Sequence, residues 1–101
     1  MQFIIMAHDG RDEGALDRRM SVRPQHLANM ETLKAQGCVV CAGGITDNGR
    51  LIGSLLVLDM DSREAVDEYL AAEPYVVNNV WEDIRVEPCN VLIANNEAYG
   101  K

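Results

Sequence analysis

Hydrophobic and polar residues repeat with two different periods along this chain, and the periods predict six elements of secondary structure. Alternating or continuous apolar stretches predict strands, and apolar residues at every third or fourth position predict helices. Turn-forming Gly, Pro and Asn residues separate these stretches. We expect strands at residues 2–8, 39–44, 51–60 and 81–86 and helices at residues 24–36 and 61–73.

Prolines set two of the expected helix boundaries. Pro24 suits the first position of a helix, where a missing N–H costs nothing, and Gly37 is a typical stop signal after the last turn. We therefore expect Arg11 to Val22 to form a loop or a short helical turn. The second helix starts in the segment Asp61-Ser62-Arg63-Glu64, which resembles a capping box, and stops at Pro74.

The order strand, helix, strand, strand, helix, strand is that of a ferredoxin-like α+β fold, β-α-β-β-α-β, with an antiparallel sheet and both helices on one face. The Asn48-Gly49 pair favours a tight hairpin between the second and third strands. A chain of 101 residues has room for one hydrophobic core, so we expect a single domain over residues 1–101. Val91 to Ile93 is expected to add a short extension.

Both faces of the expected sheet carry apolar side chains. The first strand places Phe3 and Ile5 on one face and Ile4 and Met6 on the other, and the third strand repeats this pattern. Two helices cover only one face, and a soluble monomer seldom leaves so large an apolar patch in water. We therefore expect a homodimer in which the uncovered sheet faces of two copies pack together.

Charge and hydropathy narrow the range of partners. The net charge is −7 and the pI is near 4.6, so the protein repels nucleic acid phosphates and anionic membrane surfaces. The first residues contain no basic leader, and no apolar run approaches the ~18 residues of a membrane helix. We expect a cytoplasmic protein that binds neither nucleic acid nor membranes.

Three cysteines, an odd number, indicate reduced thiols rather than a disulfide framework. Cys38 and Cys41 match a C-x-x-C pattern, but an offset of three along a strand sends two side chains to opposite faces. We interpret them as small buried strand residues, and we expect no metal and no organic cofactor.

His26 shares the apolar side of the first expected helix with Met30 and Leu33. An imidazole in that place is either a hydrogen-bonded core residue or an acid-base group. Arg23, three residues earlier, is suited to hold an anionic ligand. Arg19 either adds a second positive charge or is a solvated surface residue.

Glu73 precedes Pro74 and is either an exposed charge at a helix end or the carboxylate that orients His26. Tyr75 is a core residue or a phenol facing the pocket. Ser54 bonds to the backbone or points into a cavity, and it lacks the G-x-S-x-G elbow of a serine nucleophile. The candidate catalytic residues are His26 and Glu73, and the candidate substrate-binding residues are Arg19, Arg23, Ser54 and Tyr75.

Four segments together resemble the YciI-like (YCII-related) proteins, over essentially the whole chain. They are Arg23-Pro24-Gln25-His26-Leu27, Ala42-Gly43-Gly44, Gly53-Ser54, and Glu73-Pro74-Tyr75 followed by Val80-Trp81-Glu82. The resemblance implies a dimeric α+β barrel built from ferredoxin-like subunits, similar to the muconolactone isomerase-like proteins.

The resemblance also implies a His-Asp site, in which His26 matches the family histidine and Arg23 and Ser54 match residues that line the pocket. One member type is a dehydrochlorinase that acts on chlorinated hydroxyquinols. The chain departs from the family pattern at two places. It has Glu73 where the family has aspartate, and Gly43-Gly44 where the family often has Gly-Pro.

These residues favour three hypotheses of function. The first is a small-molecule enzyme without a cofactor, in which His26 is the general acid or base, Glu73 orients it and Arg23 binds an anionic or phenolic substrate. Proton abstraction followed by elimination or isomerisation suits such a site. The second is a non-catalytic dimer that binds a small ligand or serves as an accessory module. The third is a cofactor-free oxygenase of the same barrel type that uses Asn78, Trp81 and His26.

Overall fold

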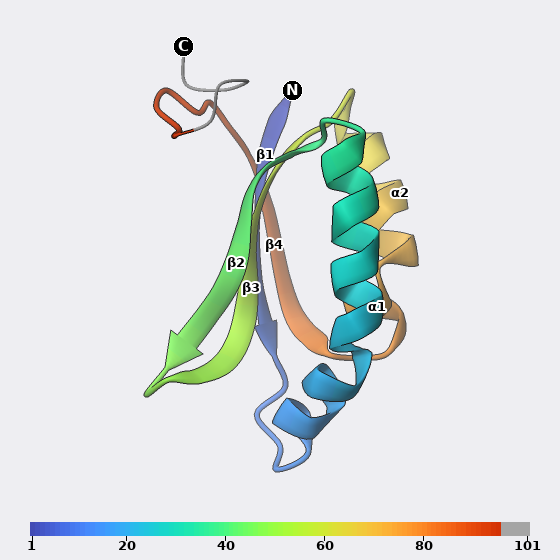
Figure 1. Ribbon diagram of the computed structural model, residues 1–101, viewed down its shortest axis with the longest axis vertical. Helices are drawn as coiled ribbons and strands as arrows, with labels where there is room; N and C mark the ends of the chain where they lie inside the picture. The colour runs from blue at the N-terminus through green and yellow to red at the C-terminus, as the bar shows by residue number, and fades with distance from the viewer. Residues whose placement is uncertain (96–101) are drawn as a thin grey trace.

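A four-stranded antiparallel sheet and three helices make up the protein, in a computed structural model that describes residues 1–95. The strands are β1 (Gln2–Asp9), β2 (Val39–Asp47), β3 (Arg50–Asp59) and β4 (Trp81–Cys89), in the spatial order β2-β3-β1-β4. The helices are α1 (Ala15–Ala35), α2 (Arg63–Ala72) and the short α3 (Pro74–Val77). The two long helices pack on the same face of the sheet (Figure 1). The ferredoxin-like α+β prediction is therefore confirmed.

Helix α1 begins nine residues earlier than the sequence pattern predicts, so the prediction of a loop or short turn over residues 11–22 holds for 11–14 and is wrong for 15–22. Pro24 lies inside the helix rather than at its first position. The side chains that α1 buries recur every three or four residues from Ala15 to Met30. Packing of this stripe against the sheet offsets the hydrogen bond that an internal proline removes. The whole charged segment Asp17 to Arg23 is thereby helical.

The tight turns follow the sequence prediction more closely. Asn48 and Gly49 both have positive φ angles, 50° and 78°, as a two-residue hairpin turn between β2 and β3 requires. Strand β4 runs on to Cys89, three residues beyond the predicted end. Residues 91–93 form no strand, so the predicted extension is wrong, and Leu92 and Ile93 are exposed.

The junction of α2 and α3 determines where Glu73 lies. Ser62 caps α2 by accepting a hydrogen bond from the Ala65 amide at 3.1 Å, and α2 stops before Pro74 as predicted. Pro74 opens α3, and a residue before proline is disfavoured in the helical region. Glu73 is accordingly extended, with φ −65° and ψ 125°, and the chain changes direction at this residue.

The hydrophobic core lies between the sheet and the helices. In the pairing of β1 with β3, Phe3 lies opposite Leu58 and Ile5 opposite Leu56, and all four side chains are at most 2% exposed. The other face of the sheet carries apolar side chains that the helices leave uncovered, and Met6 on that face is 38% exposed.

The cysteines are free, and Cys41 is exposed while Cys38 is half-buried, so the interpretation of both as buried residues is wrong. Within residues 1–95, no cluster of three or more potential ligand side chains is arranged to hold a metal ion. The helices of this part of the chain are each too short or too polar to span a membrane.

Candidate active site

His26 and Glu73 meet in the core, between the middle of α1 and the α2–α3 junction. His26 Nδ1 lies 2.6 Å from Glu73 Oε1, and the side chains are 9% and 0% exposed. His26 and Glu73 are 47 positions apart in the chain, and strands β2 and β3 and helix α2 lie between them, so the contact depends on the tertiary fold. The structure therefore brings together the two residues that the sequence singles out as catalytic candidates.

Both oxygens of the buried Glu73 carboxylate have hydrogen-bond donors. Oε1 also accepts from the backbone N–H of Tyr75 at 3.1 Å, and Oε2 accepts from the Tyr69 hydroxyl. Burial raises the pKa of Glu73, but the hydrogen bonds from His26, Tyr69 and Tyr75 together outweigh it and leave the pKa below the ordinary value. An ionised carboxylate only accepts, so the Nδ1 atom that faces Glu73 carries a proton, and in the neutral form of the imidazole the lone pair is on Nε2.

Aromatic rings fix the plane of the imidazole. The His26 and Tyr75 rings are stacked, with centroids 4.0 Å apart and an interplanar angle of 14°. Trp81 approaches both rings edge-on, at 5.9 Å from His26 and 5.5 Å from Tyr75. The Tyr75 hydroxyl is buried and makes no hydrogen bond within the described part of the chain. Burial raises the pKa of Tyr75, although the nearby charges of Arg19 and Arg23 act to lower it.

Arg19 is a buried cation that links the stacked rings to the end of the sheet. Its Nη1 donates to both oxygens of Asp9 at 3.0 and 3.1 Å, its Nη2 donates to Ser54 Oγ at 2.9 Å, and its Cζ lies 4.9 Å from the Tyr75 ring centroid. Burial raises the pKa of Asp9 against the opposing effect of Arg19. The alternative of a solvated Arg19 is therefore wrong, since the residue is 4% exposed.

Ser54 serves as an acceptor in this network rather than as a nucleophile. Its Oγ accepts from Arg19 and from Trp81 Nε1, the latter at 3.1 Å. A serine nucleophile needs a base that accepts its proton, and both identified partners of Ser54 are donors. Ser54 instead joins β3 to α1 and to the start of β4.

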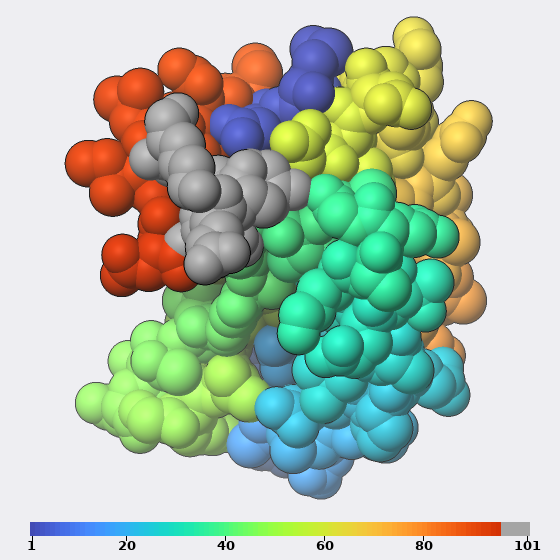
Figure 2. All heavy atoms as spheres, turned by 45° about the horizontal axis from the view of Figure 1, so that its top comes forward, coloured from blue at the N-terminus to red at the C-terminus, as the bar shows by residue number. Residues whose placement is uncertain are grey.

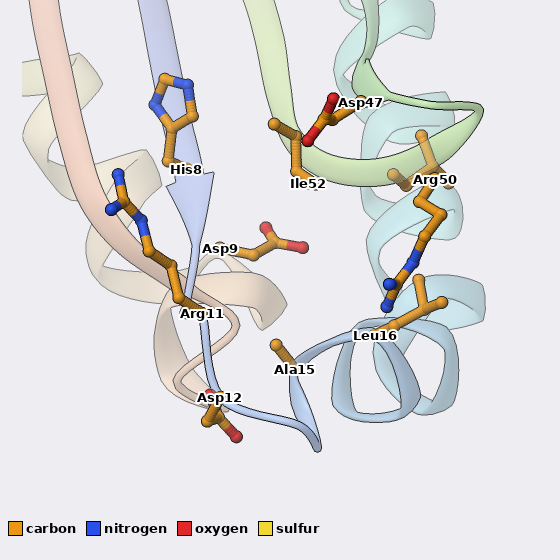
Figure 3. Close-up of a pocket in the computed structure, with 11 residues that line it drawn as sticks. His8, Asp9, Arg11, Asp12, Ala15, Leu16, Asp47, Arg50 and Ile52 are labelled. Carbon is orange, nitrogen blue, oxygen red and sulfur yellow. The ribbon is translucent and has the colours of Figure 1, made fainter.

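A pocket of about 380 Å³ lies beside this network, between the end of β1, the first turns of α1 and the β2–β3 hairpin. The surface is hollowed between the green hairpin and the cyan helix (Figure 2). The Asp9 carboxylate points toward the space between Ile52 and Arg50 (Figure 3). Leu16 and Ala15 supply apolar surface on the helix side. The pocket thus combines a buried carboxylate, a cation and apolar walls.

Comparison with known proteins assigns the family. Residues 1–90 match the YCII-related domain. The chain belongs to this family. It is 35% identical over 95 residues to Protein YciI of Escherichia coli O6:H1, covering 87% of this chain and 95% of that protein. It is 30% identical, with the same coverage, to an uncharacterised protein of Haemophilus influenzae.

A solved structure extends the comparison to an enzyme. This YCII-related protein superimposes with a TM-score of 0.79 and 26% identity on 5-chloro-2-hydroxyhydroquinone dehydrochlorinase (TftG) from Burkholderia phenoliruptrix AC1100, in complex with 2,5-dihydroxybenzoquinone. The match covers 90% of this chain and 95% of that chain. A further relative, aspercryptin biosynthesis cluster protein B of Emericella nidulans, is 33% identical over 75 residues, which are 66% of this chain and 48% of that protein.

Of the other candidate residues of this YCII-related protein, two are buried beside the dyad and two are exposed. Tyr75 and Ser54 are buried in the network, whereas Arg23 is exposed on α1 and makes no hydrogen bond or ion pair within residues 1–95. Asn78, the oxygenase candidate, is exposed and donates to the Pro74 carbonyl at 2.8 Å, which leaves it outside the ring cluster.

Two buried residues of the site escaped the sequence analysis. Asp9 reads as half of an Asp-Gly turn signal, yet it ends β1 at a register shift and binds Arg19. Tyr69 reads as an apolar residue of the second helix. The available signal is its position four residues before Glu73, a spacing that brings two side chains together on one helix face.

Proposed function

We propose that this protein is a small-molecule enzyme in which His26 and Glu73 perform acid-base chemistry for an elimination or isomerisation. The observation that carries the proposal is the buried contact of 2.6 Å between the His26 imidazole and the Glu73 carboxylate. The same carboxylate also accepts hydrogen bonds from the Tyr69 hydroxyl and the Tyr75 amide. Support comes from the dehydrochlorinase that shares the fold at 26% identity. A histidine whose Nδ1 is held by a carboxylate presents its Nε2 for proton transfer, which is the arrangement of a general acid or base.

The reaction would start at His26 Nε2, because Nδ1 is occupied by Glu73. Nε2 takes a proton from the substrate, and the negative carboxylate stabilises the imidazolium that forms. In an elimination, the electron pair left on the substrate forms a new double bond, and a halide leaves with its bonding electrons. In an isomerisation, the imidazolium returns the proton to another atom of the substrate.

We propose that the substrate is a small anionic or phenolic molecule that enters through the pocket beside Asp9. Asp9 lines that pocket and binds Arg19, which lies over the Tyr75 ring on the side of the dyad, and Arg23 adds a second cation one helical turn later. A phenolate or enolate gains from such cations as negative charge develops on its oxygen. The quinone bound by the dehydrochlorinase is a ligand of this chemical type.

The decisive experiment measures chloride release from 5-chloro-2-hydroxyhydroquinone. We expect His26→Ala to lower the rate by ~10² to 10⁴, which is the usual contribution of a general acid or base. Gln25→Ala is the matched control, because Gln25 is the preceding residue and is exposed. An unchanged rate in His26→Ala would exclude the dyad. A quinone ligand that raises the melting temperature of the wild type with no product from any phenolic substrate would favour a binding module instead.

We also propose that the uncovered face of the sheet packs against the same face of a second copy. Ile4, Met6 and Leu55 lie on that face, and burying them would remove apolar surface from water. Light scattering at micromolar concentration should give a mass near twice 11.2 kDa. Met6→Lys, which adds a charge at the centre of the face, should give a monomer. A monomeric wild type would refute the proposal.

A further inference from the structure

Tyr69 contacts Glu73 Oε2, the carboxylate oxygen that does not contact His26. It lies on α2, four residues before Glu73, and its side chain is buried with 9% exposed. Its hydroxyl donates to Glu73 Oε2, and Met30 Sδ lies 3.6 Å from the Tyr69 hydroxyl oxygen. The phenol thus faces a carboxylate and a thioether, both of which accept hydrogen bonds.

We propose that Tyr69 is a positioning residue, which holds the Glu73 carboxylate in the orientation that keeps His26 Nδ1 protonated. The catalytic consequence of this assignment rests on the proposed function. The orientation of His26 itself can be measured without any substrate.

The distribution of donors on Glu73 gives Tyr69 this role. Oε1 accepts from both His26 and the Tyr75 amide, whereas Tyr69 is the one donor identified for Oε2 within residues 1–95. A glutamate side chain has three rotatable bonds, so a contact at one oxygen leaves the other free to turn. The Tyr69 hydroxyl removes that freedom. Burial and the adjacent Glu73 charge raise the pKa of Tyr69, so it remains a donor throughout the working pH range.

Loss of the Tyr69 hydroxyl should change the proton on His26. A fully buried carboxylate oxygen without a donor is costly, and protonation of the carboxyl group relieves that cost. A neutral Glu73 has a hydroxyl that donates to Nδ1, and the imidazole proton then resides on Nε2. In that tautomer the nitrogen available for the substrate carries a hydrogen instead of a lone pair.

The test compares Tyr69→Phe with Met30→Leu by ¹⁵N NMR of the His26 ring at neutral pH. Met30→Leu is the matched control, since it replaces the other neighbour of the hydroxyl and keeps its hydrogen bond to Glu73. We expect the Nδ1–H tautomer in the wild type and in Met30→Leu, and a shift to the Nε2–H tautomer in Tyr69→Phe. The kcat of Tyr69→Phe should fall by about 10-fold to 100-fold, with KM within about twofold.

An unchanged tautomer and an unchanged kcat in Tyr69→Phe would overturn the assignment. If Tyr69→Phe fails to fold, proton NMR of the wild type supplies the test. A Tyr69 hydroxyl proton that is hydrogen-bonded to Glu73 should be shifted downfield, and it should show a nuclear Overhauser effect to the Met30 methyl group. Absence of that signal would equally overturn it. A tautomer shift in a protein without turnover would refute the proposed function and leave the role of Tyr69 in orienting His26 intact.

Discussion

The buried ion pair between Arg19 and Asp9 gives the sharpest test of the energetics. The two side chains are 5% and 4% exposed, and Arg19 also donates to Ser54. Arg19→Met removes the positive charge and keeps most of the apolar side-chain volume. Asp9 then remains as a buried carboxylate without its ionic partner, which typically costs about 3–5 kcal/mol.

That loss is a large fraction of the whole stability of a domain of 101 residues, which is about 5–15 kcal/mol. Adding Asp9→Asn to Arg19→Met should recover part of the loss, because the second substitution removes the uncompensated charge. The Arg19→Met variant should also become more stable relative to the wild type as the pH falls. Burial raises the pKa of Asp9, so its carboxyl group takes up a proton in the folded state before it does so in the unfolded chain.

Urea denaturation followed by tryptophan fluorescence measures these effects directly, since Trp81 is the single tryptophan and bonds to Ser54. Arg18→Met is the matched control: Arg18 is the adjacent residue and pairs with Asp12 at the surface, so its loss should change stability little. A destabilisation by Arg19→Met no greater than that of Arg18→Met would refute the reasoning. So would an Asp9→Asn substitution that destabilises the Arg19→Met variant further.

Three further predictions concern the carboxylate, the sheet and the pocket. Burial raises the pKa of Glu73, but its hydrogen bonds outweigh burial and lower the pKa below 4.5 in the folded state. The ionised Glu73 carboxylate therefore stabilises the protein above pH 4.5, and this stabilisation is lost as the pH falls through the lower folded-state pKa. The acid-induced loss of stability should be shallower in Glu73→Gln than in the control Glu68→Gln, because Glu68 is exposed. Gly53→Ala should lower the melting temperature by at least about 4 °C, because the added Cβ would lie 2.3 Å from a backbone oxygen of β1. Gly43→Ala is the control and should have a small effect, because its added Cβ would meet nothing within 4 Å. Ile52→Trp, which fills the pocket, should weaken the binding of 2,5-dihydroxybenzoquinone in calorimetry, and unchanged affinity would remove the pocket from the proposed binding site.

The sequence contains enough information for the order of elements but not for all of their boundaries. Apolar alternation predicts each strand, and Asn48-Gly49 predicts the hairpin, because these signals are local. Pro24 misleads for the same reason: its local preference is for a helix start, and the buried stripe from Ala15 to Met30 overrides it. The stripe can be recognised only when the sheet that it covers is known.

The residues of the candidate site likewise fall into those that local sequence signals suggest and those that only the tertiary fold reveals. His26 and Glu73 can be suggested from sequence because a histidine on an apolar helix face and a carboxylate before a proline are each unusual. Asp9 and Tyr69 cannot, since each looks ordinary until a residue from another element supplies its partner. Asp9 acquires its role from Arg19, ten residues later, across a turn that the pattern leaves undefined.

The sequence resemblance implies an aspartate at the position of Glu73, and the structure shows how the longer side chain of this protein is accommodated. One additional methylene group moves a carboxylate by about 1.5 Å, which would break a contact with His26 if the backbone were fixed and the extra length had no place to go. Glu73 has an extended backbone between α2 and α3, and its side chain turns back to accept a hydrogen bond from the Tyr75 amide, two residues further on. Its second oxygen then reaches the preceding turn of α2, where Tyr69 lies. The carboxylate consequently has two hydrogen-bond donors besides His26, the Tyr69 hydroxyl and the Tyr75 amide, and these hold the longer and more flexible side chain in a single orientation toward His26.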